Sequence, residues 1–579
     1  MQLKQKNKKH KTKGKHEVTK HNISKSKLSD KRLLFKESFA RMQGVKLVGY
    51  VGTTTEFQLS ELSEAIDRNN MYLVHPTINI LDYIQIVDYL IILECDEAIL
   101  QLITHQGHSN IYYFGDKDKS KVGKHASSIK HLLQSLKTSI PKPHPYLKER
   151  GFCITEQMHY DEATETLVFS GLCRGPWNAN QLCHVPNCGD FEILKISSFN
   201  KSEDMEAEVD LSIRNENGDT IVDYNNDAKE VEMEECHNDI IDNSEEKEFV
   251  DGLTEVERQE EYDEFIQNKY KDHLQFPDEV DACMNDCAIE LYKDYRGLES
   301  FKTSPWDPYE NLPNEYSQLF EFKHFKGIKN KYIADAKVAP VRDRFVSVYL
   351  KFPSRLLSQV STTMVLWNLM PMETRSTVVN MTIIPTLDYI STITNENVSS
   401  LVKSGDELII QYGFRRYKVN CLFSQESHNS SNNVHKLEPY LTSTCIASAV
   451  LPVTFLCGPI LFFKQSHHLE LIASGSLLNA DFKRVIAKRI ILTGDPFKVK
   501  ATHKGVVCRF MFFNAEDVNY FKCIKLFTKL GLRGRIKESL GTHGYMKCIF
   551  NQPLLHHDTV CMALYKREFP QLGYTLYSE

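Results

Sequence analysis

A series of short apolar segments separated by turns, at residues 488–550, constrains the fold more than any other stretch of the chain. The apolar segments are residues 489–492, 506–513, 524–527 and 545–550. Turn residues separate them at 494–496, 514–517 and 541–544. Apolar runs of this length between turns are typical of antiparallel strands. This many in succession predict a closed or nearly closed β-barrel.

Basic side chains lie at the ends of these segments and in the turns. They are Lys488, Arg489, Arg509, Lys529, Arg533, Arg535, Lys537 and Lys547. A β-domain with basic loops is suited to contact phosphate groups. This stretch is therefore a candidate nucleic-acid-binding surface.

The formal net charge of −6 conceals two segments of opposite sign. Residues 1–32 carry about 12 Lys and Arg against about 2 acids, and residues 203–264 carry roughly 25 acids against roughly 4 bases. Neither composition can bury a core, so both segments are predicted to be disordered when free. The remainder, about +5 in charge, is long enough for about three or four domains.

Each charged segment has two interpretations. The N-terminal arm, which contains Lys8, Lys9, Lys11, Lys13 and Lys15, is interpreted either as an RNA-binding arm or nuclear address, or as a solubilising tail. The acidic insert is interpreted either as a solvated linker or as a competitor for the protein's own basic surfaces. The hydrophilic start of the chain lacks the apolar core of a signal peptide, and the 15 Cys without paired spacing are predicted to be reduced intracellular thiols.

Residues 45–140 are predicted to form a parallel, doubly wound α/β unit. Strands at 45–51, 89–93 and 111–114 alternate with helices at 59–69 and 127–138, as in that fold class. A phosphate-binding loop needs glycines, a Lys and a Ser or Thr. The sequence GYVGTTTE at 49–56 has no Lys and places an acid where phosphate would lie, and no N-K-x-D sequence occurs. We predict a degenerate GTPase-like scaffold without enzymatic activity or cofactor.

Residues 141–200 are predicted to begin a β-barrel domain, with strands at 166–172 and 191–196. Cys173, Cys183, His184 and Cys188 lie near these strands, but their spacing matches no ordinary zinc site. Core thiols and a structural histidine are the favoured interpretation, with no metal bound. The predicted division of the chain is an arm with a helix at 29–42 (1–44), the α/β unit (45–140), the start of a barrel (141–200), the acidic insert (201–270), an extended strap that completes the second domain (271–335), a β-domain (336–445) and a C-terminal β-barrel (446–579).

Two further stretches each leave an alternative open. Residues 445–463 are long and apolar enough for a transmembrane helix, but internal prolines and a glycine favour two buried strands joined by turns. Residues 413–418, GFRRYK, pair basic with aromatic side chains, which suits phosphate contact and base stacking. The alternative there is a strand edge protected by charge.

Several long blocks resemble a known family, the twenty-S rRNA accumulation factors of small-subunit assembly, which are related to the Bms-type assembly GTPase. The blocks lie at residues 172–191, 295–313 (YRGLESFKTSPWDPYENLP), 413–417 (GFRRY) and 488–547, which ends in ESLGTHGYMK. Lys566 and Arg567 close the similarity. It covers most of residues 140–570.

The resemblance implies a translational-GTPase-like architecture, with α/β plus all-β character: a degenerate G-like domain followed by β-barrels. It also implies a non-catalytic factor that binds the pre-40S particle, its rRNA, ribosomal proteins and other assembly factors, and that prevents premature binding of translation factors. A divergent GTPase is the alternative. A nuclear and nucleolar location with passage to the cytoplasm is expected, without membrane association. The predicted contact residues are the five arm lysines with Arg415, Arg416, Lys418, Arg533, Arg535, Lys537, His543 and Lys547.

Overall fold

The computed structural model describes the chain in ordered pieces separated by gaps. The described residues are 46–52, 63–64, 66, 71–74, 78–93, 95–108, 110–113, 123–126, 128–139, 141, 150–198, 205–206, 278–280, 287–299, 304–336, 341–395, 401–426, 434–455, 458–465, 469–499 and 504–577. Four β-sheets account for most of this structure. The predicted helix at 29–42 and the acidic stretch 207–264 lie outside these residues.

The first sheet is parallel and belongs to the predicted α/β unit. It runs in the order β2-β1-β3-β4-β5. Its strands are β1 (Lys46–Val51), β2 (Met71–Leu73), β3 (Tyr89–Ile92), β4 (Ile111–Tyr113) and β5 (Lys124–His125), with helices α3 (Ile80–Ile86), α4 (Glu97–His105) and α5 (Ile129–Thr138). Every residue of β3 is buried, as expected of a strand inside a parallel sheet. The predicted class of this unit is confirmed, while the predicted helix at 59–69 falls largely outside the described residues.

The second sheet closes into a barrel, because β8 pairs with both β13 and β9. Its strands are β6 (Phe152–Asp161), β7 (Thr166–Trp177), β8 (Leu182–Val185), β9 (Gly189–Ser198), β12 (Val341–Lys351) and β13 (Val365–Asn368), and β10 (Met205–Glu206) extends the edge at β9. The strands that complete the barrel therefore come from residues 341–368. The sequence-based division places these residues in a separate β-domain, because apolar periodicity identifies a strand but does not identify its distant partner.

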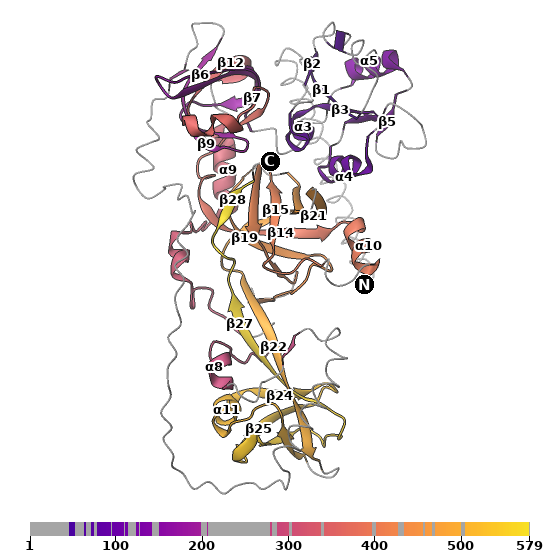
Figure 1. Ribbon diagram of the computed structural model, residues 1–579, viewed down its shortest axis with the longest axis vertical. Helices are drawn as coiled ribbons and strands as arrows, with labels where there is room; N and C mark the ends of the chain where they lie inside the picture. The colour runs from indigo at the N-terminus through magenta and orange to yellow at the C-terminus, as the bar shows by residue number, and fades with distance from the viewer. Residues whose placement is uncertain are drawn as a thin grey trace, which may run out of the picture.

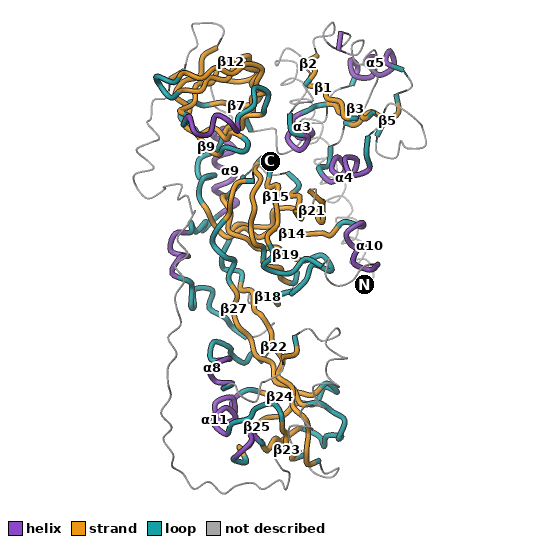
Figure 2. The backbone as a smooth tube through the Cα atoms, in the orientation of Figure 1, coloured by secondary structure: helices purple, strands orange, loops and turns teal. Residues whose placement is uncertain are grey.

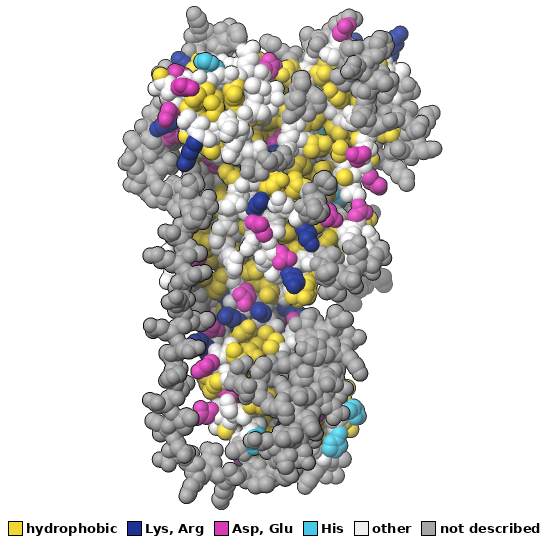
Figure 3. Space-filling model, in the orientation of Figure 1, with side chains coloured by type: hydrophobic (Ala, Val, Ile, Leu, Met, Phe, Trp, Pro, Cys, Tyr) yellow, Lys and Arg dark blue, Asp and Glu magenta, His cyan; other side chains and the backbone are white. Residues whose placement is uncertain are grey.

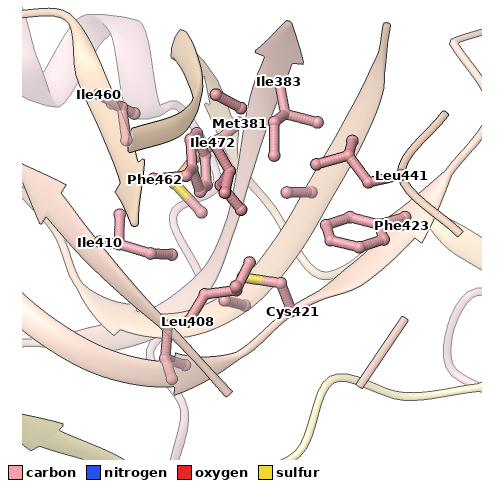
Figure 4. Packing of buried hydrophobic residues seen from close by; sticks show 14 of the residues in the cluster. Met381, Ile383, Leu408, Ile410, Cys421, Phe423, Leu441, Ile460, Phe462 and Ile472 are labelled. Atoms are coloured by element: carbon pink, nitrogen blue, oxygen red, sulfur yellow. The ribbon is translucent and has the colours of Figure 1, made fainter. Parts of the chain in front are cut away.

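The third sheet is antiparallel and forms the middle of the molecule. Its strands are β14 (Ser376–Pro385), β15 (Glu407–Tyr412), β16 (Arg415–Asn420), β17 (Leu422–Ser424), β19 (Cys445–Pro452), β20 (Ile460–Gln465), β21 (Leu469–Ala480) and β28 (Tyr574–Leu576). Figure 4 shows side chains such as Met381, Ile410 and Phe462 pointing into its core. Strands β19 and β20 are the two buried strands predicted within residues 445–463. None of the described helices has the length and apolar character needed to cross a membrane.

The fourth sheet forms a C-terminal barrel, closed by the pairing of β22 with β27. The barrel begins at residue 485 and not at 446 as predicted, because β19, β20 and β21 belong to the third sheet. Its strands are β22 (Val485–Lys498), β23 (Gly505–Arg509), β24 (Lys525–Thr528), β25 (Arg533–Ser539), β26 (Met546–Phe550) and β27 (Val560–Glu568), with the short strands β11 (Glu279–Val280) and β18 (Val434–Lys436) beside β22. Two predicted turns are wrong. Residues 494–496 lie inside β22, which continues through a bulge between Pro496 and Lys498, and residues 514–517 begin helix α11 (Ala515–Tyr520).

The long strands β22 and β27 join the C-terminal barrel to the middle sheet, while the first barrel and the α/β unit lie at the opposite end (Figures 1 and 2). The segment predicted as a strap lies along this connection: Arg296 pairs through its backbone with Tyr565, and Arg567 donates to the Pro308 carbonyl oxygen over 2.6 Å. The prediction that this segment completes the second domain is wrong, because its strand β11 pairs with β22 of the C-terminal barrel. The remaining helices are α8 (Ala288–Tyr292), η2 (Asn314–Gln318), α9 (Phe325–Ala336), η3 (Ser354–Gln359), α10 (Leu387–Asn395), η5 (Phe521–Cys523) and η6 (Thr542–Gly544).

Candidate nucleic-acid interface

Strand β25 presents three of the predicted contact residues on the outside of the C-terminal barrel. Its sequence, RGRIKES, directs Ile536 into the core, while Arg533, Arg535 and Lys537 are exposed. A register shift between Ile536 and Glu538 leaves Lys537 as the extra residue of a β-bulge. Bulges redirect side chains, and here Lys537 stays on the outer surface beside the two arginines.

Packing explains why a glycine separates the two arginines. A Cβ added at Gly534 would lie 2.5 Å from the ring of Phe550. Phe550 is buried in the barrel core, so the ring cannot move outward. The inward position of the R-G-R sequence is therefore restricted to glycine, and the two flanking outward positions carry cations.

Neighbouring strands add more positive charge to this surface. Lys525 on β24 lies directly opposite Arg535, and both side chains are exposed. Like charges opposite each other destabilise a sheet, and the Glu299 carboxylate offsets the repulsion by pairing with Lys525. Lys547 on β26 pairs with Glu538 over 3.1 Å. The hydrogen bond from Lys547 and its charge lower the pKa of Glu538.

Within the described part of the chain, Arg533, Arg535 and Lys537 have no carboxylate within ion-pair distance. On the face drawn in Figure 3, Lys and Arg side chains are scattered, and many of them lie near Asp and Glu. Arginine forks and lysine ammonium groups both bind phosphate. The exposed surface of β25, defined by Arg533, Arg535 and Lys537, is therefore the basic strand surface that best suits a polyanion.

His543 lies in a tight turn beside this barrel, between β25 and β26. It is exposed, with a φ of 65°, and Gly541 and Gly544 on either side also have positive φ values of 96° and 66°. A Cβ at Gly544 would meet the backbone oxygen of Phe512 at 2.1 Å. The glycines allow the chain to fold closely over Phe512, and this conformation leaves the imidazole outside.

The structure corrects the predicted role of Arg415 and Arg416, which begin β16. Arg415 is fully buried: it donates to the Asp190 carboxylate over 3.0 Å and to the Glu373 carbonyl oxygen over 2.8 Å. Arg416 is 7% exposed and pairs with Asp82 of α3. Both arginines connect parts of the protein instead of facing solvent, so the prediction that they contact RNA is wrong.

Arg150 and Glu373 extend this connection. Arg150 donates two hydrogen bonds to the Glu373 carboxylate, one of them 2.9 Å long, and both side chains are buried. The same carboxylate accepts the backbone N–H of Met370 over 2.8 Å and of Phe455 over 2.7 Å. Burial alone would raise the pKa of Glu373, but the charge and hydrogen bonds of Arg150, the charge of Arg415 and the Met370 N–H together outweigh it and hold the pKa below its ordinary value. We call Arg150, His184, Asp190, Glu373 and Arg415 the buried junction.

His184 is the structural histidine predicted from the sequence. Its Nδ1 lies 2.6 Å from Asp190, so the imidazole donates to this carboxylate. Burial lowers the pKa of His184, although Asp190 opposes this effect. Cys173 and Cys183 are buried in the barrel core. Among the described residues, no group of three His, Cys, Asp or Glu side chains is placed to hold a metal ion.

Other predicted residues divide between the surface and the undescribed arm. Lys418 is half-buried, with its Nζ 5.8 Å from the centre of the Tyr577 ring. Lys525 is a basic residue of this surface that the sequence analysis missed, because only the cross-strand register places it beside Arg535. The arm lysines Lys8, Lys9, Lys11, Lys13 and Lys15 lie outside the described residues.

The α/β unit uses its first lysine for structure. Lys46 of β1 is buried, and its Nζ donates to the carbonyl oxygens of Lys137 and Ser139 over 3.0 and 2.8 Å. These carbonyls lie at the end of α5, where unpaired acceptors need donors. Burial lowers the pKa of Lys46, and Asp88 opposes the shift. The loop after β1, where a nucleotide phosphate would lie in a GTPase, falls mostly outside the described residues.

Comparison with known proteins gives two family matches. Residues 280–570 match the family described as 40S ribosome biogenesis protein Tsr1 and BMS1 C-terminal. Residues 141–202 match the AARP2CN (NUC121) domain. Together the two matches cover the first-barrel strands β6–β9 and most of the chain after the acidic insert.

Individual relatives agree with these matches. A pre-rRNA-processing protein TSR1 homolog of Caenorhabditis elegans is 31% identical over 540 residues, covering 77% of this chain and 67% of the relative. Ribosome biogenesis protein tsr1 of Schizosaccharomyces pombe is 39% identical over 437 residues (73% and 53%), and the human pre-rRNA-processing protein TSR1 homolog is 37% identical over 355 residues (59% and 41%). The chain thus spans about two thirds of the nematode relative and about half or less of the other two. Apo elongation factor SelB of Methanococcus maripaludis is similar with a TM-score of 0.47 at 7% identity, over 91% of this chain and 99% of SelB.

Proposed function

Because the chain belongs to the 40S ribosome biogenesis family of Tsr1 and BMS1, we propose that it is a non-catalytic factor that binds the pre-40S particle and its rRNA during small-subunit maturation. The predicted membership in a family of small-subunit assembly factors is confirmed at this level. The protein occupies a translation-factor site on the particle and prevents premature factor binding. It acts in the nucleus and nucleolus and accompanies the particle to the cytoplasm.

The observation that carries the RNA-binding part of this proposal is the exposed surface of β25. Arg533, Arg535 and Lys537 have no described carboxylate partner, and Lys525 and Lys547 lie on the strands on either side. Leaving like charges together on a sheet is unfavourable unless an anion neutralises them. Phosphate contacts of this kind position a protein on RNA without reading its sequence.

Support for occupancy of a factor site comes from the arrangement of the units. A parallel α/β unit precedes two closed β-barrels and the middle sheet, which is the order that the resemblance to translational GTPases implies. The buried junction and the Arg416–Asp82 pair connect the α/β unit, the first barrel and the middle sheet. A ribosomal site that recognises the outline of a translation factor would accept such an arrangement.

The absence of enzymatic activity is also part of the proposal. It rests on the sequence after β1, which has no lysine to neutralise phosphate. Equilibrium binding of labelled GTP to the purified chain tests it. Saturable binding in the micromolar range would favour the alternative, a divergent GTPase that acts in assembly.

The experiment for the RNA surface is charge reversal of two arginines, Arg533→Glu with Arg535→Glu. The matched control is Lys351→Glu with Lys403→Glu, which changes the net charge equally at exposed lysines of other units. We expect the first variant to bind small-subunit rRNA at least about tenfold more weakly in a mobility-shift assay, since each charge-assisted hydrogen bond contributes about 1.5–3 kcal/mol. Equal affinity of the two variants would refute the assignment of β25.

A further inference from the structure

Helix α9 and the turn before it carry a second concentration of positive charge. Residues 323–336 contain four lysines and one histidine against a single acid, Asp335. The basic residues are Lys323, His324, Lys326, Lys329 and Lys331. All are exposed except Lys329, which is half-buried. None of the five forms an ion pair with a described carboxylate.

The apolar side of α9 fixes which way this charge points. Phe325, Ile328 and Tyr332 pack against Phe455 of the middle domain. The Phe325 and Tyr332 rings both lie 5.9 Å from the ring of Phe455, and Tyr332 is stacked on it. The helix is therefore held by one face. Lys323 and Lys326 are exposed, and Lys329 is half-buried at the edge of the packed face. Figure 1 shows α9 between the first barrel and the middle sheet.

A cavity of about 780 Å³ lies beside the start of α9. Lys323, Lys326 and Lys329 line one side, and Leu477 and Leu478 of β21 line the other. Leu478 is 46% exposed, so the cavity opens to the surface. A single acid, Asp481, contributes to the lining. The site thus combines three lysines and a single acid with an apolar wall.

Gly327 also lines this cavity, and the fold does not require a glycine there. A Cβ at this position would meet nothing nearer than the Cβ of His324 at 3.8 Å. Glycine is among the poorest helix formers. A glycine without an internal steric reason suits a position where the backbone of a partner approaches closely.

We propose that this face, defined by Lys323, Lys326, Gly327 and Lys329, binds the phosphate backbone of an RNA as a contact separate from β25. The inference rests on the proposed function and adds a second surface to it. Lys326 and Lys329 are about 4.5 Å apart along the helix axis, and Lys323 precedes them in the turn, so three ammonium groups extend along one side of the cavity. This arrangement favours an extended polyanion over a free anion. The leucine wall then packs against sugars or bases as the lysines neutralise phosphates.

The test is a salt titration of RNA affinity with the full chain, using a fluorescein-labelled RNA duplex as the probe. The α9 variant removes three cations and is Lys323→Gln with Lys326→Gln and Lys329→Gln. The control variant removes three exposed lysines from other units and is Lys130→Gln with Lys351→Gln and Lys403→Gln. We expect the slope of log affinity against log salt to fall by about 2–3 in the α9 variant and to stay near the wild-type value in the control.

Gly327→Ala provides a second measurement that does not depend on charge. Alanine fits the space and favours helix, so the thermal midpoint should stay the same or rise. RNA affinity should fall nevertheless, because the added methyl group blocks close approach. Unchanged affinity in both the triple variant and Gly327→Ala would overturn the inference.

The outcomes separate this inference from the proposed function. Loss of RNA binding in the β25 variant alone would leave the proposed function standing and refute the α9 contact. Failure of the wild-type chain to bind RNA would refute both. Unchanged RNA affinity together with a zero-length cross-link between the α9 lysines and residues 203–264 would instead assign the face to the chain's own acidic segment, and would also overturn the inference.

Discussion

Replacement of Glu373 by glutamine provides a sharp test of the buried junction. The substitution keeps the size of the side chain but removes its charge. Arg150, which is 1% exposed, then lacks the carboxylate that balances its own charge. Both oxygens of Glu373 accept two hydrogen bonds each, from Arg150 and from the backbone N–H of Met370 or Phe455. Whichever way the amide is oriented, its NH₂ group faces two donors.

The expected cost follows from these contacts. Removing one partner of a buried ion pair destabilises a protein by about 3–5 kcal/mol, because the remaining charge stays buried without compensation. The loss of unfolding free energy in Glu373→Gln should fall within this range and not below it, because the new NH₂ group also faces two N–H donors. Replacing Arg150 as well, as Arg150→Met with Glu373→Gln, removes the uncompensated charge. The double variant should therefore be more stable than the sum of the single losses by about 1–3 kcal/mol.

Urea denaturation followed by tryptophan emission measures these changes, since the Trp367 ring stacks on Phe414 at 5.2 Å beside the junction. Glu162→Gln, at an exposed position in the β6–β7 turn, serves as the control and should stay within about 0.5 kcal/mol of wild type. A Glu373→Gln variant as stable as this control would refute the account of the junction. Strict additivity in the double variant would refute the coupling between Arg150 and Glu373.

Three further predictions use the same structure. The pKa of Glu373 is lowered in the folded protein. The stability that its carboxylate contributes is therefore complete above the ordinary carboxyl pKa of about 4 and is lost as the pH falls through the lower pKa of the folded state. The urea midpoint of the wild type, measured as the pH is lowered, should show this loss, and the profile of Glu373→Gln should be flatter. Asp82→Asn leaves Arg416 buried without its carboxylate, so amide hydrogen exchange in α3 should become faster while exchange in β25 stays unchanged. Equal exchange in α3 of the wild type and of Asp82→Asn would contradict the conclusion that this pair holds α3 against β16. Gly544→Ala places a Cβ 2.1 Å from a backbone oxygen at a residue whose φ is 66°. It should lower the thermal midpoint of the C-terminal barrel by more than Gly531→Ala does, because Gly531 has a φ of 89° but open space around it. Equal losses in the two variants would disprove the steric argument.

Local patterns in the sequence predicted the secondary structure well where a strand is short and bounded by turns. The apolar runs that became β3, β19, β20 and β26 are examples. The sequence did not predict which strands share a sheet. The first barrel closes with residues 341–368, which are separated from β9 by more than a hundred residues. The turn predicted at 494–496 is wrong because local sequence does not show strand pairing. Pairing with β23 and β27 keeps these residues in one long strand despite Pro496.

The candidate site was predictable to the extent that local pattern decides exposure. The alternation in β25 places Ile536 inside and Arg533 and Arg535 outside, as its sequence suggests. Arg415 and Arg416 follow a similar basic and aromatic pattern but are buried, because Asp190 and Asp82 come from distant parts of the chain. Sequence alone cannot show that a carboxylate more than two hundred residues away will neutralise an arginine.

The most direct test of the proposed function is sedimentation of the tagged protein from native lysate on a sucrose gradient, with the RNA in each fraction identified. The account predicts co-migration with a small-subunit particle that carries unprocessed rRNA. It also predicts loss of this co-migration as salt is raised, because phosphate contacts weaken steeply with ionic strength. Migration only as free protein at low salt would contradict the proposal that this chain binds the maturing small subunit.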